Sequence, residues 1–337
     1  MKKAHRIVCS VVAVVTALVL VLPLAADNSK DNPNDIGDRK VAGRSIISMQ
    51  KEMAIGKQYA QQIDRSARLI RDPVVTEYVN RLEQNIARNS DAKFPISVKV
   101  IDDPTINAMT LPGGFMYVDS GTILAADNEA QLAGVLAHET GHVAERSWAS
   151  EMTKREILSF ATLPLMFTPM SLGTYYALNA AMGTGIPIAF LKFGRNQEEG
   201  ADFLGLQYMW KSGYDPNQYA AFFGKVVNEE RQSPGSVAQI FSDHPPTPDR
   251  IIKCEEEIKN ILPPRAEYLE NTSEFNDIKA RLLADLRVHR SRFQSGQPTL
   301  ERRTPNNPPP PQPNSKGGDT GDQPPVLGHP GQNPNQN

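Results

Sequence analysis

The feature that most constrains this chain is the run from His138 to His142, which reads His-Glu-Thr-Gly-His. Apolar residues at helical spacing surround the run, and Asn128 ahead of them is a good helix N-cap. On a helix, residues four apart lie on the same face, so both imidazoles can reach one metal ion. Glu139 between them could take a proton from a water molecule at that metal. The run therefore predicts a zinc-binding helix of a hydrolase.

Two imidazoles leave a zinc ion under-coordinated, because catalytic zinc usually has three protein ligands together with water. Residues 194–202 form a charged run that is followed by apolar residues at helical spacing, which predicts a second helix. Within this run Glu198 and Asp202 lie one turn apart. We predict that Glu198 binds the metal and that Asp202 accepts the outer N–H of a ligand histidine. The alternative is that both acids lie on a solvated helix face.

Together the two runs resemble the HtpX/CaaX-endopeptidase-type zinc metallopeptidases, a gluzincin family, and in particular their periplasmic BepA-like branch. The resemblance lies in the order of His-Glu-x-x-His and the Gly-Arg-x-x-Glu-x-x-Ala-Asp pattern of residues 194–202, although the family usually has serine at Gly194. Residues 107–118, 244–251 and 274–282 match further family segments. The resemblance implies one zinc ion per chain, protein substrates and peptide-bond hydrolysis with Glu139 as catalytic base.

A strand is expected after the turn at residues 112–113, because residues 114–118 are rich in β-formers and alternate. The resemblance identifies residues 107–118, which include this segment, with the family's edge strand before the active-site helix. An exposed strand edge can hold a substrate chain extended by backbone pairing, whatever the substrate side chains are. A plain sheet strand is the bland alternative. The residues predicted to bind substrate in this way are Gly114, Phe115, Met116 and Tyr117.

His244 lies in a proline-rich segment that cannot be helical. As a fourth zinc ligand it would close the coordination sphere and leave the enzyme latent, because catalytic zinc keeps an open position. The resemblance implies a self-inhibiting role of this kind. As a nearby donor His244 would instead stabilise the oxyanion of the tetrahedral intermediate, a task for which Arg250 is a second candidate. A surface histidine without a role is the third alternative.

The expected fold class is α+β and predominantly helical: a zincin-like metalloprotease domain with a small β-sheet whose edge strand lies beside the active-site helix. Apolar spacing predicts helices over residues 46–67, 74–87 and 218–230, and Asp72 with Pro73 is a start signal for the second of them. Alternation predicts a strand near residues 94–102. Internal repeats are not evident, so the helical-repeat domain of longer BepA-like proteins is not expected.

The two ends of the chain differ in composition from residues 45–300, which we assign to one metallopeptidase domain. Residues 1–26 have a basic start and an apolar run too short for a typical membrane span, which predicts a cleaved signal peptide. An uncleaved inner-membrane anchor is the alternative. Residues 27–44 are polar and expected to be flexible. Residues 304–337 are rich in Pro, Asn and Gly and predict a disordered tail.

Residues 157–191 contain no charged side chain, but repeated Pro and Gly argue against a single membrane span. We favour a buried helical pair with an active-site lid. The alternative is a surface that makes peripheral contact with the membrane or with unfolded clients.

The full chain has a net charge of −2 and no basic cluster, so a nucleic-acid partner is not expected. The expected location is the periplasm, because the signal peptide would leave only one cysteine and no internal disulfide. The leading hypothesis is a zinc endopeptidase acting on misfolded or stalled envelope proteins, a substrate class that the resemblance implies. The alternative is a periplasmic chaperone or binding module whose zinc site is structural or closed.

Overall fold

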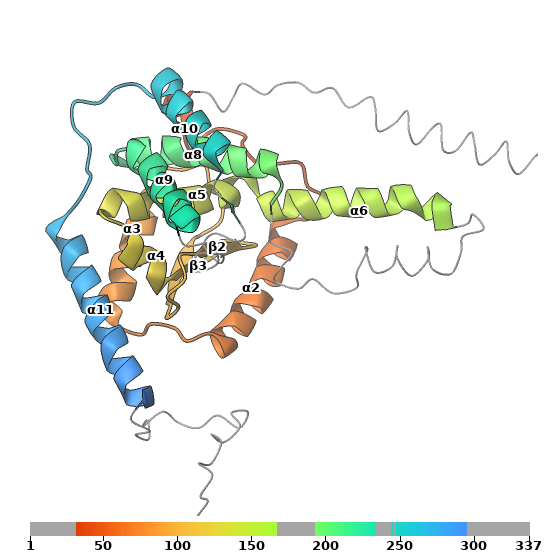
Figure 1. Ribbon diagram of the computed structural model, residues 1–337. Coiled ribbons are helices and arrows are strands. Elements are labelled where there is room, and N and C mark those ends of the chain that lie inside the picture. The colour runs from red at the N-terminus through yellow and green to blue at the C-terminus, as the bar shows by residue number, and fades with distance from the viewer. Residues whose placement is uncertain (1–31, 167–192, 233–243, 246, 295–337) are drawn as a thin grey trace, which may run out of the picture. The chain divides into compact units, whose positions relative to one another are not determined.

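The computed structural model describes residues 32–166, 193–232, 244–245 and 247–294 (Figure 1). The predicted signal peptide, the predicted tail and residues 167–191 of the uncharged stretch lie outside the described residues. The described part is mostly helical with one small sheet, which confirms the predicted fold class. Its elements are η2 (Pro33–Asp35), α2 (Met49–Ser66), α3 (Pro73–Arg88), β1 (Ser97–Ile101), β2 (Ala108–Leu111), β3 (Phe115–Asp119), α4 (Ser120–Ala125), α5 (Glu129–Glu145), α6 (Ser147–Met166), α8 (Arg195–Ser212), α9 (Asn217–Gln232), α10 (Pro248–Ile261) and α11 (Ser273–Gln294).

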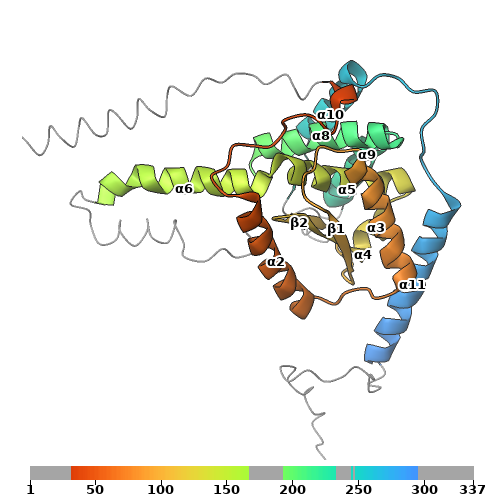
Figure 2. The same ribbon diagram turned by 180° about the vertical axis from the view of Figure 1, so that it is seen from behind.

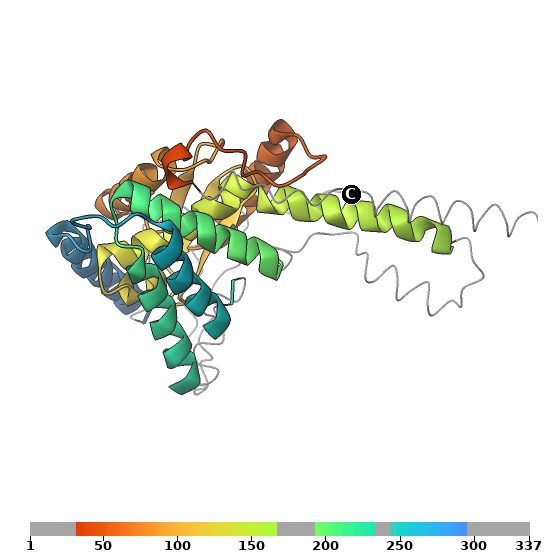
Figure 3. The ribbon, with the colours of Figure 1, turned by 90° about the horizontal axis from the view of Figure 1, so that it is seen from above.

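Helices α5 and α8 pack against each other at the centre of the fold, and α5 is buried along its whole length (Figure 3). Two glycines allow this close approach. A Cβ on Gly141 would lie 2.9 Å from the Cα of Ala201, and a Cβ on Gly205 would lie 3.0 Å from the backbone nitrogen of His138. The two backbones are therefore near enough for side chains of α8 to reach the His-Glu-x-x-His face of α5.

The helix start signals read from the sequence are present. Asp72 accepts hydrogen bonds from the backbone N–H groups of Val74 and Val75, and Pro73 is the first residue of α3. Asn128 accepts a hydrogen bond from the backbone N–H of Gln131 at the start of α5. Such caps satisfy donors that a helix N-terminus otherwise leaves unpaired, which is why they fix where these helices begin.

The sheet has the strand order β1-β3-β2, with β1 parallel and β2 antiparallel to β3. The predicted edge strand at Gly114–Tyr117 is therefore wrong in its residues. Residues Phe115–Asp119 form the central strand, whose backbone pairs with Ser97–Ile101 on one side and Ala108–Leu111 on the other. The edge strand beside the active-site helix is β2, which packs on α5. Pairing order depends on contacts between distant residues, which alternation within one strand cannot reveal.

The two faces of the sheet are covered by different helices (Figure 2). On one face Met116 and Val118 belong to the main apolar core, which also contains residues of α3, α5 and α11. On the other face the Tyr117 hydroxyl donates to the Ala60 carbonyl of α2 at 3.1 Å and to Asp64 at 2.9 Å. Burial on both faces fixes the register of the strands, because a one-residue slip would exchange the two faces.

The described part of the segment before α2 packs against the rest of the domain, and the flexibility predicted for residues 27–44 stays a prediction. Within its described part, Arg39 and Val41 are buried. Arg39 forms a buried ion pair of 2.6 Å with Asp91, between α3 and β1. The sequence offers no local sign of this contact because the two residues lie 52 positions apart.

Helix α6 carries the beginning of the uncharged stretch and extends away from the sheet (Figure 1). Ile157 in this helix is 51% exposed. Among the helices of the described residues, none combines the length and the apolar character that a membrane crossing requires. Two alternatives for residues 157–191 remain predictions. One is peripheral contact with the membrane, and the other is a buried pair of helices with an active-site lid.

Candidate metal centre

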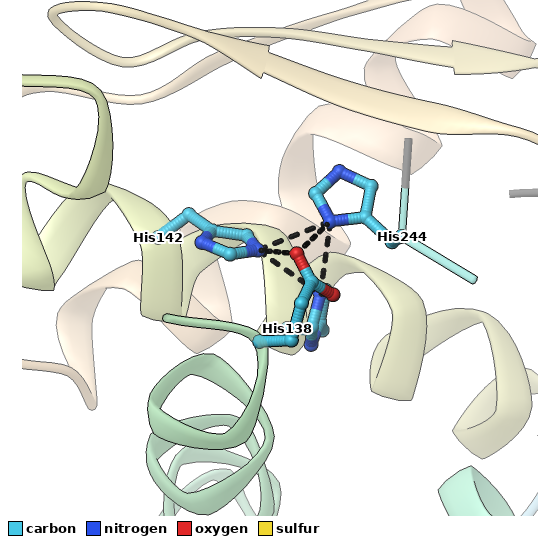
Figure 4. A group of neighbouring side chains, drawn as sticks. His138, His142 and His244 are labelled. Atoms are coloured by element: carbon cyan, nitrogen blue, oxygen red, sulfur yellow. Dashed lines mark hydrogen bonds and ion pairs between the residues drawn. The ribbon is translucent and has the colours of Figure 1, made fainter. Parts of the chain in front are cut away.

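Four buried side chains from three parts of the chain converge beside the contact of α5 with α8 (Figure 4). They are His138 and His142 of α5, Glu198 of α8, and His244 of the segment before α10. The two α5 imidazoles have their Nε2 atoms 3.2 Å apart. His244 Nδ1 lies 3.2 Å from His142 Nε2, 3.4 Å from His138 Nε2 and 2.9 Å from Glu198 Oε1. One ligand atom of each residue thus lies within 4.8 Å of the others.

These donors fit a zinc ion. Zinc favours four nitrogen, oxygen or sulfur ligands in a tetrahedron, and bonds of about 2.1 Å place the donors about 3.4 Å apart. The atoms facing one another here are three imidazole nitrogens and Glu198 Oε1. The pairs of these atoms that are in contact are 2.9 to 3.5 Å apart. Imidazole nitrogens brought this close repel one another unless a proton or a cation lies between them. Burial lowers the pKa of both His138 and His142, which favours their neutral, metal-binding forms.

The outer nitrogens of the two α5 histidines also have partners. His138 Nδ1 lies 2.9 Å from Asp202 Oδ1, and His142 Nδ1 lies 3.1 Å from the Ser147 hydroxyl. Ser147 can reach His142 because Arg146, the residue that caps the C-terminus of α5, is in the left-handed region with φ 52°, and α6 begins at the next residue. Partners of this kind set the tautomer and the ring orientation of metal-binding imidazoles.

Asp202 is the centre of a buried polar network behind His138. Arg250 donates to both of its carboxylate oxygens at 2.7 Å, and the Tyr219 hydroxyl donates to Oδ1. Burial alone would raise the pKa of Asp202, but hydrogen bonds from Arg250 and His138 hold it well below its usual range. Asp202 is therefore an anion that can accept the outer N–H of His138. Arg250 also lies 3.0 Å from Glu198 Oε2, so it links two acids of α8.

Glu139 lies beside the cluster and is fully buried. Neither of its carboxylate oxygens accepts a hydrogen bond from the described part of the chain. The nearest ionisable partner is His244, whose Nε2 lies 3.5 Å from Glu139 Oε1. A buried carboxylate that accepts no hydrogen bond lowers the stability of the fold. The position of Glu139 is therefore explained best by contact with a reactant during catalysis.

The structure brings together seven residues that the sequence analysis singled out: His138, Glu139, His142, Glu198, Asp202, His244 and Arg250. The strand residues Gly114 to Tyr117 are not at an exposed edge, as described above. Sequence reasoning missed Tyr219 and Ser147, which contact the ligand histidines. Tyr219 occupies an ordinary apolar position of α9, and Ser147 an ordinary helix start, so neither carries a signal in the sequence alone.

A helical domain with a His-Glu-x-x-His helix beside a buried cluster of nitrogen and oxygen donors defines a zincin-like metallopeptidase. The sequence profile described as Peptidase family M48 matches residues 73–258, which is more than half of the chain. This chain therefore belongs to peptidase family M48, a family of zinc metallopeptidases.

Several relatives of known name are similar to this chain. It is 28% identical to the beta-barrel assembly-enhancing protease of Escherichia coli over 301 residues, which is 86% of this chain and 59% of the relative. It is 29% identical to the protein of that name from Yersinia pestis, over 66% of this chain and 48% of the relative. It is 32% identical to the mitochondrial metalloendopeptidase OMA1 of Schizosaccharomyces pombe, over 59% of this chain and 56% of the relative. The chain thus spans roughly half the length of these relatives.

Proposed function

We propose that this protein is a zinc-dependent endopeptidase in which His138, His142 and Glu198 hold one zinc ion and Glu139 is the catalytic base. The observation that carries the proposal is the buried cluster of donors with the Glu139 carboxylate beside it, which accepts no hydrogen bond from the described residues. When bound, zinc would supply a Lewis acid and a water molecule of lowered pKa. Glu139 would accept the proton of the attacking water and return it to the leaving amine of the cleaved peptide.

The substrate strand of this proposal is β2 rather than the segment first predicted. Among the described residues, Ala108–Leu111 pairs with β3 on one side only, and β2 packs on α5, the helix that carries the catalytic base. A substrate chain added to its outer edge would be held extended by backbone hydrogen bonds. This mode accepts many sequences, which suits a protease acting on misfolded proteins.

The proposed substrates are misfolded or stalled envelope proteins in the periplasm. The protein would be exported to this compartment by a signal peptide that is then cleaved. The names of the Escherichia coli and Yersinia pestis relatives, beta-barrel assembly-enhancing protease, support this setting. A chain anchored to the inner membrane by an uncleaved N-terminal segment is the alternative.

The described conformation supports latency through His244. Its Nδ1 takes the place of a fourth zinc donor, and its Nε2 lies beside Glu139, where a water molecule would have to react. Arg250 holds the segment in this place by donating to the backbone carbonyls of His244 at 3.3 Å and of Pro245 at 3.1 Å. Its other donors are on Asp202, and its Nη1 also lies 3.0 Å from Glu198 Oε2, so Arg250 ties this segment to two acids of α8. We therefore assign His244 and Arg250 to regulation.

A second function is favoured by the same closure. If His244 never leaves, the zinc is structural and the protein is a chaperone or binding module, because closed coordination is typical of structural zinc. Zinc content and casein cleavage, measured on the wild type, Glu139→Gln and His244→Ala proteins, separate the two functions. Cleavage by wild type or His244→Ala that Glu139→Gln abolishes supports the protease. A zinc-loaded protein inactive in both forms supports the binding role.

A further inference from the structure

We propose that Tyr219 is a positioning residue for the metal, acting through Asp202 to fix the orientation and tautomer of His138. The inference rests on the proposed function, because it takes His138 as a metal ligand. Tyr219 belongs to α9 and is 2% exposed. Its hydroxyl donates to Asp202 Oδ1 and lies 2.9 Å from His138 Nδ1.

The hydrogen-bond partners determine where the protons are. The Tyr219 hydroxyl has a single proton, which it gives to the Asp202 carboxylate. Its oxygen therefore faces His138 Nδ1 as an acceptor, as does Asp202 Oδ1 at 2.9 Å. Two acceptors at one ring nitrogen require a proton there, so the lone pair of His138 is on Nε2. That atom is the one that faces His142 and His244.

The backbone is built to bring Tyr219 to this place. Gly134 lies one turn before His138 on α5, and a Cβ there would come within 3.0 Å of the Tyr219 ring and 3.1 Å of its Cβ. The absence of a side chain at Gly134 thus lets α9 approach α5. The Tyr219 ring then stacks on the His138 ring, with centroids 6.0 Å apart and an interplanar angle of 24°. Phe223 packs edge-on against Tyr219 from the same helix and holds it there.

The hydroxyl can be tested apart from the ring. Tyr219→Phe keeps the packing and removes only the donor to Asp202 and the acceptor for His138. The zinc affinity of the full chain, measured by competition with a chromogenic chelator, is expected to fall about tenfold, the low end for loss of a partner behind a ligand. Unchanged affinity would overturn the inference.

Tyr214→Phe is the matched control. Tyr214 is also buried, and its hydroxyl donates at 2.8 Å to Glu129 at the start of α5, away from the cluster. Its variant should lose a similar amount of stability in urea and keep the zinc affinity of the wild type. Equal losses of zinc affinity in the two variants would show that Tyr219 acts only through general stability, and the inference would fail.

A double-mutant cycle tests the route through Asp202. If Tyr219 acts by holding Asp202, Tyr219→Phe should weaken zinc binding much less in an Asp202→Asn background than in the wild type. Fully additive losses would exclude that route. The readout is independent of peptide hydrolysis. Wild-type and His244→Ala proteins that both bind zinc through His138 but cleave nothing would defeat the proposed protease and leave the role of Tyr219 intact.

Discussion

At the scale of single residues, the cluster separates groups that hold a metal from a group that reacts. His138, His142 and Glu198 each have a second contact that orients them, through Asp202, Ser147 and Arg250. Glu139 has no donor among the described residues, although it is fully buried. From this contrast we assign metal binding to the three oriented side chains and proton transfer to Glu139. Two predictions follow from this assignment.

Replacing Glu139 with Gln should preserve metal binding and abolish hydrolysis, because the amide keeps the shape of the side chain but cannot take a proton. We expect wild-type zinc content and a loss of casein cleavage of at least about 100-fold, measured in the His244→Ala background if the wild type is latent. Glu199→Gln is the control, since Glu199 is paired with Lys253 outside the cluster. Retained cleavage by Glu139→Gln would refute its role as the base.

Replacing His244 with Ala should raise activity, because it removes the fourth donor and leaves three protein ligands, as in catalytic zinc sites. Zinc is expected to stay bound, and casein cleavage should rise severalfold above the wild type. His289→Ala, in α11, should change neither quantity. If His244→Ala lowered cleavage while keeping its zinc, His244 would assist the reaction rather than inhibit it.

At the scale of elements, the site depends on how closely α5 and α8 approach each other. A Cβ on Gly141 would lie 2.7 Å from the carbonyl oxygen of Ala201, a backbone atom that can move only with its helix. The approach that brings Glu198 to the two histidines is therefore built into the backbone contact of the helices. Side-chain packing alone would not bring the two helices so close.

Gly141→Ala should force the two helices apart. We expect the free energy of unfolding to fall by about 1–3 kcal/mol, as for overpacked cores, and zinc affinity to fall with it. Gly224→Ala is a matched control, because a Cβ at that position of α9 meets nothing within 4 Å. Urea denaturation should show this control to be neutral or more stable by about 0.5–1 kcal/mol. Equal stability of the two variants would contradict the account.

At the scale of the whole molecule, the described part of the N-terminal segment is a structural piece of the domain. Arg39→Ala removes the guanidinium from the buried Asp91, and removing one partner of a buried pair costs about 3–5 kcal/mol. Urea denaturation should detect this loss. Lys40→Ala, at an exposed neighbour, should change the free energy of unfolding by less than about 0.5 kcal/mol. A neutral Arg39→Ala variant would show that this ion pair does not hold the segment to the domain.

Much of the site could be predicted from the sequence because its signals are local. The His-Glu-x-x-His run, the cap at Asn128 and the charged run that contains Glu198 can each be recognised within a few residues. Tyr219 and the pairing of Arg39 with Asp91 could not be predicted, because each depends on a contact between distant segments. The position of Phe115–Asp119 as the central strand depends in the same way on which strands become its neighbours.

The central claim is that one zinc ion is held by the two imidazoles of α5 and the carboxylate of α8, with His244 closing the site. X-ray absorption at the zinc edge of the purified full chain tests it most directly. The account predicts one zinc per chain, with four nitrogen and oxygen neighbours at about 2.0–2.2 Å and the scattering pattern of several imidazoles. A protein that takes up no zinc, or a zinc ion surrounded by six oxygens without imidazole, would contradict it.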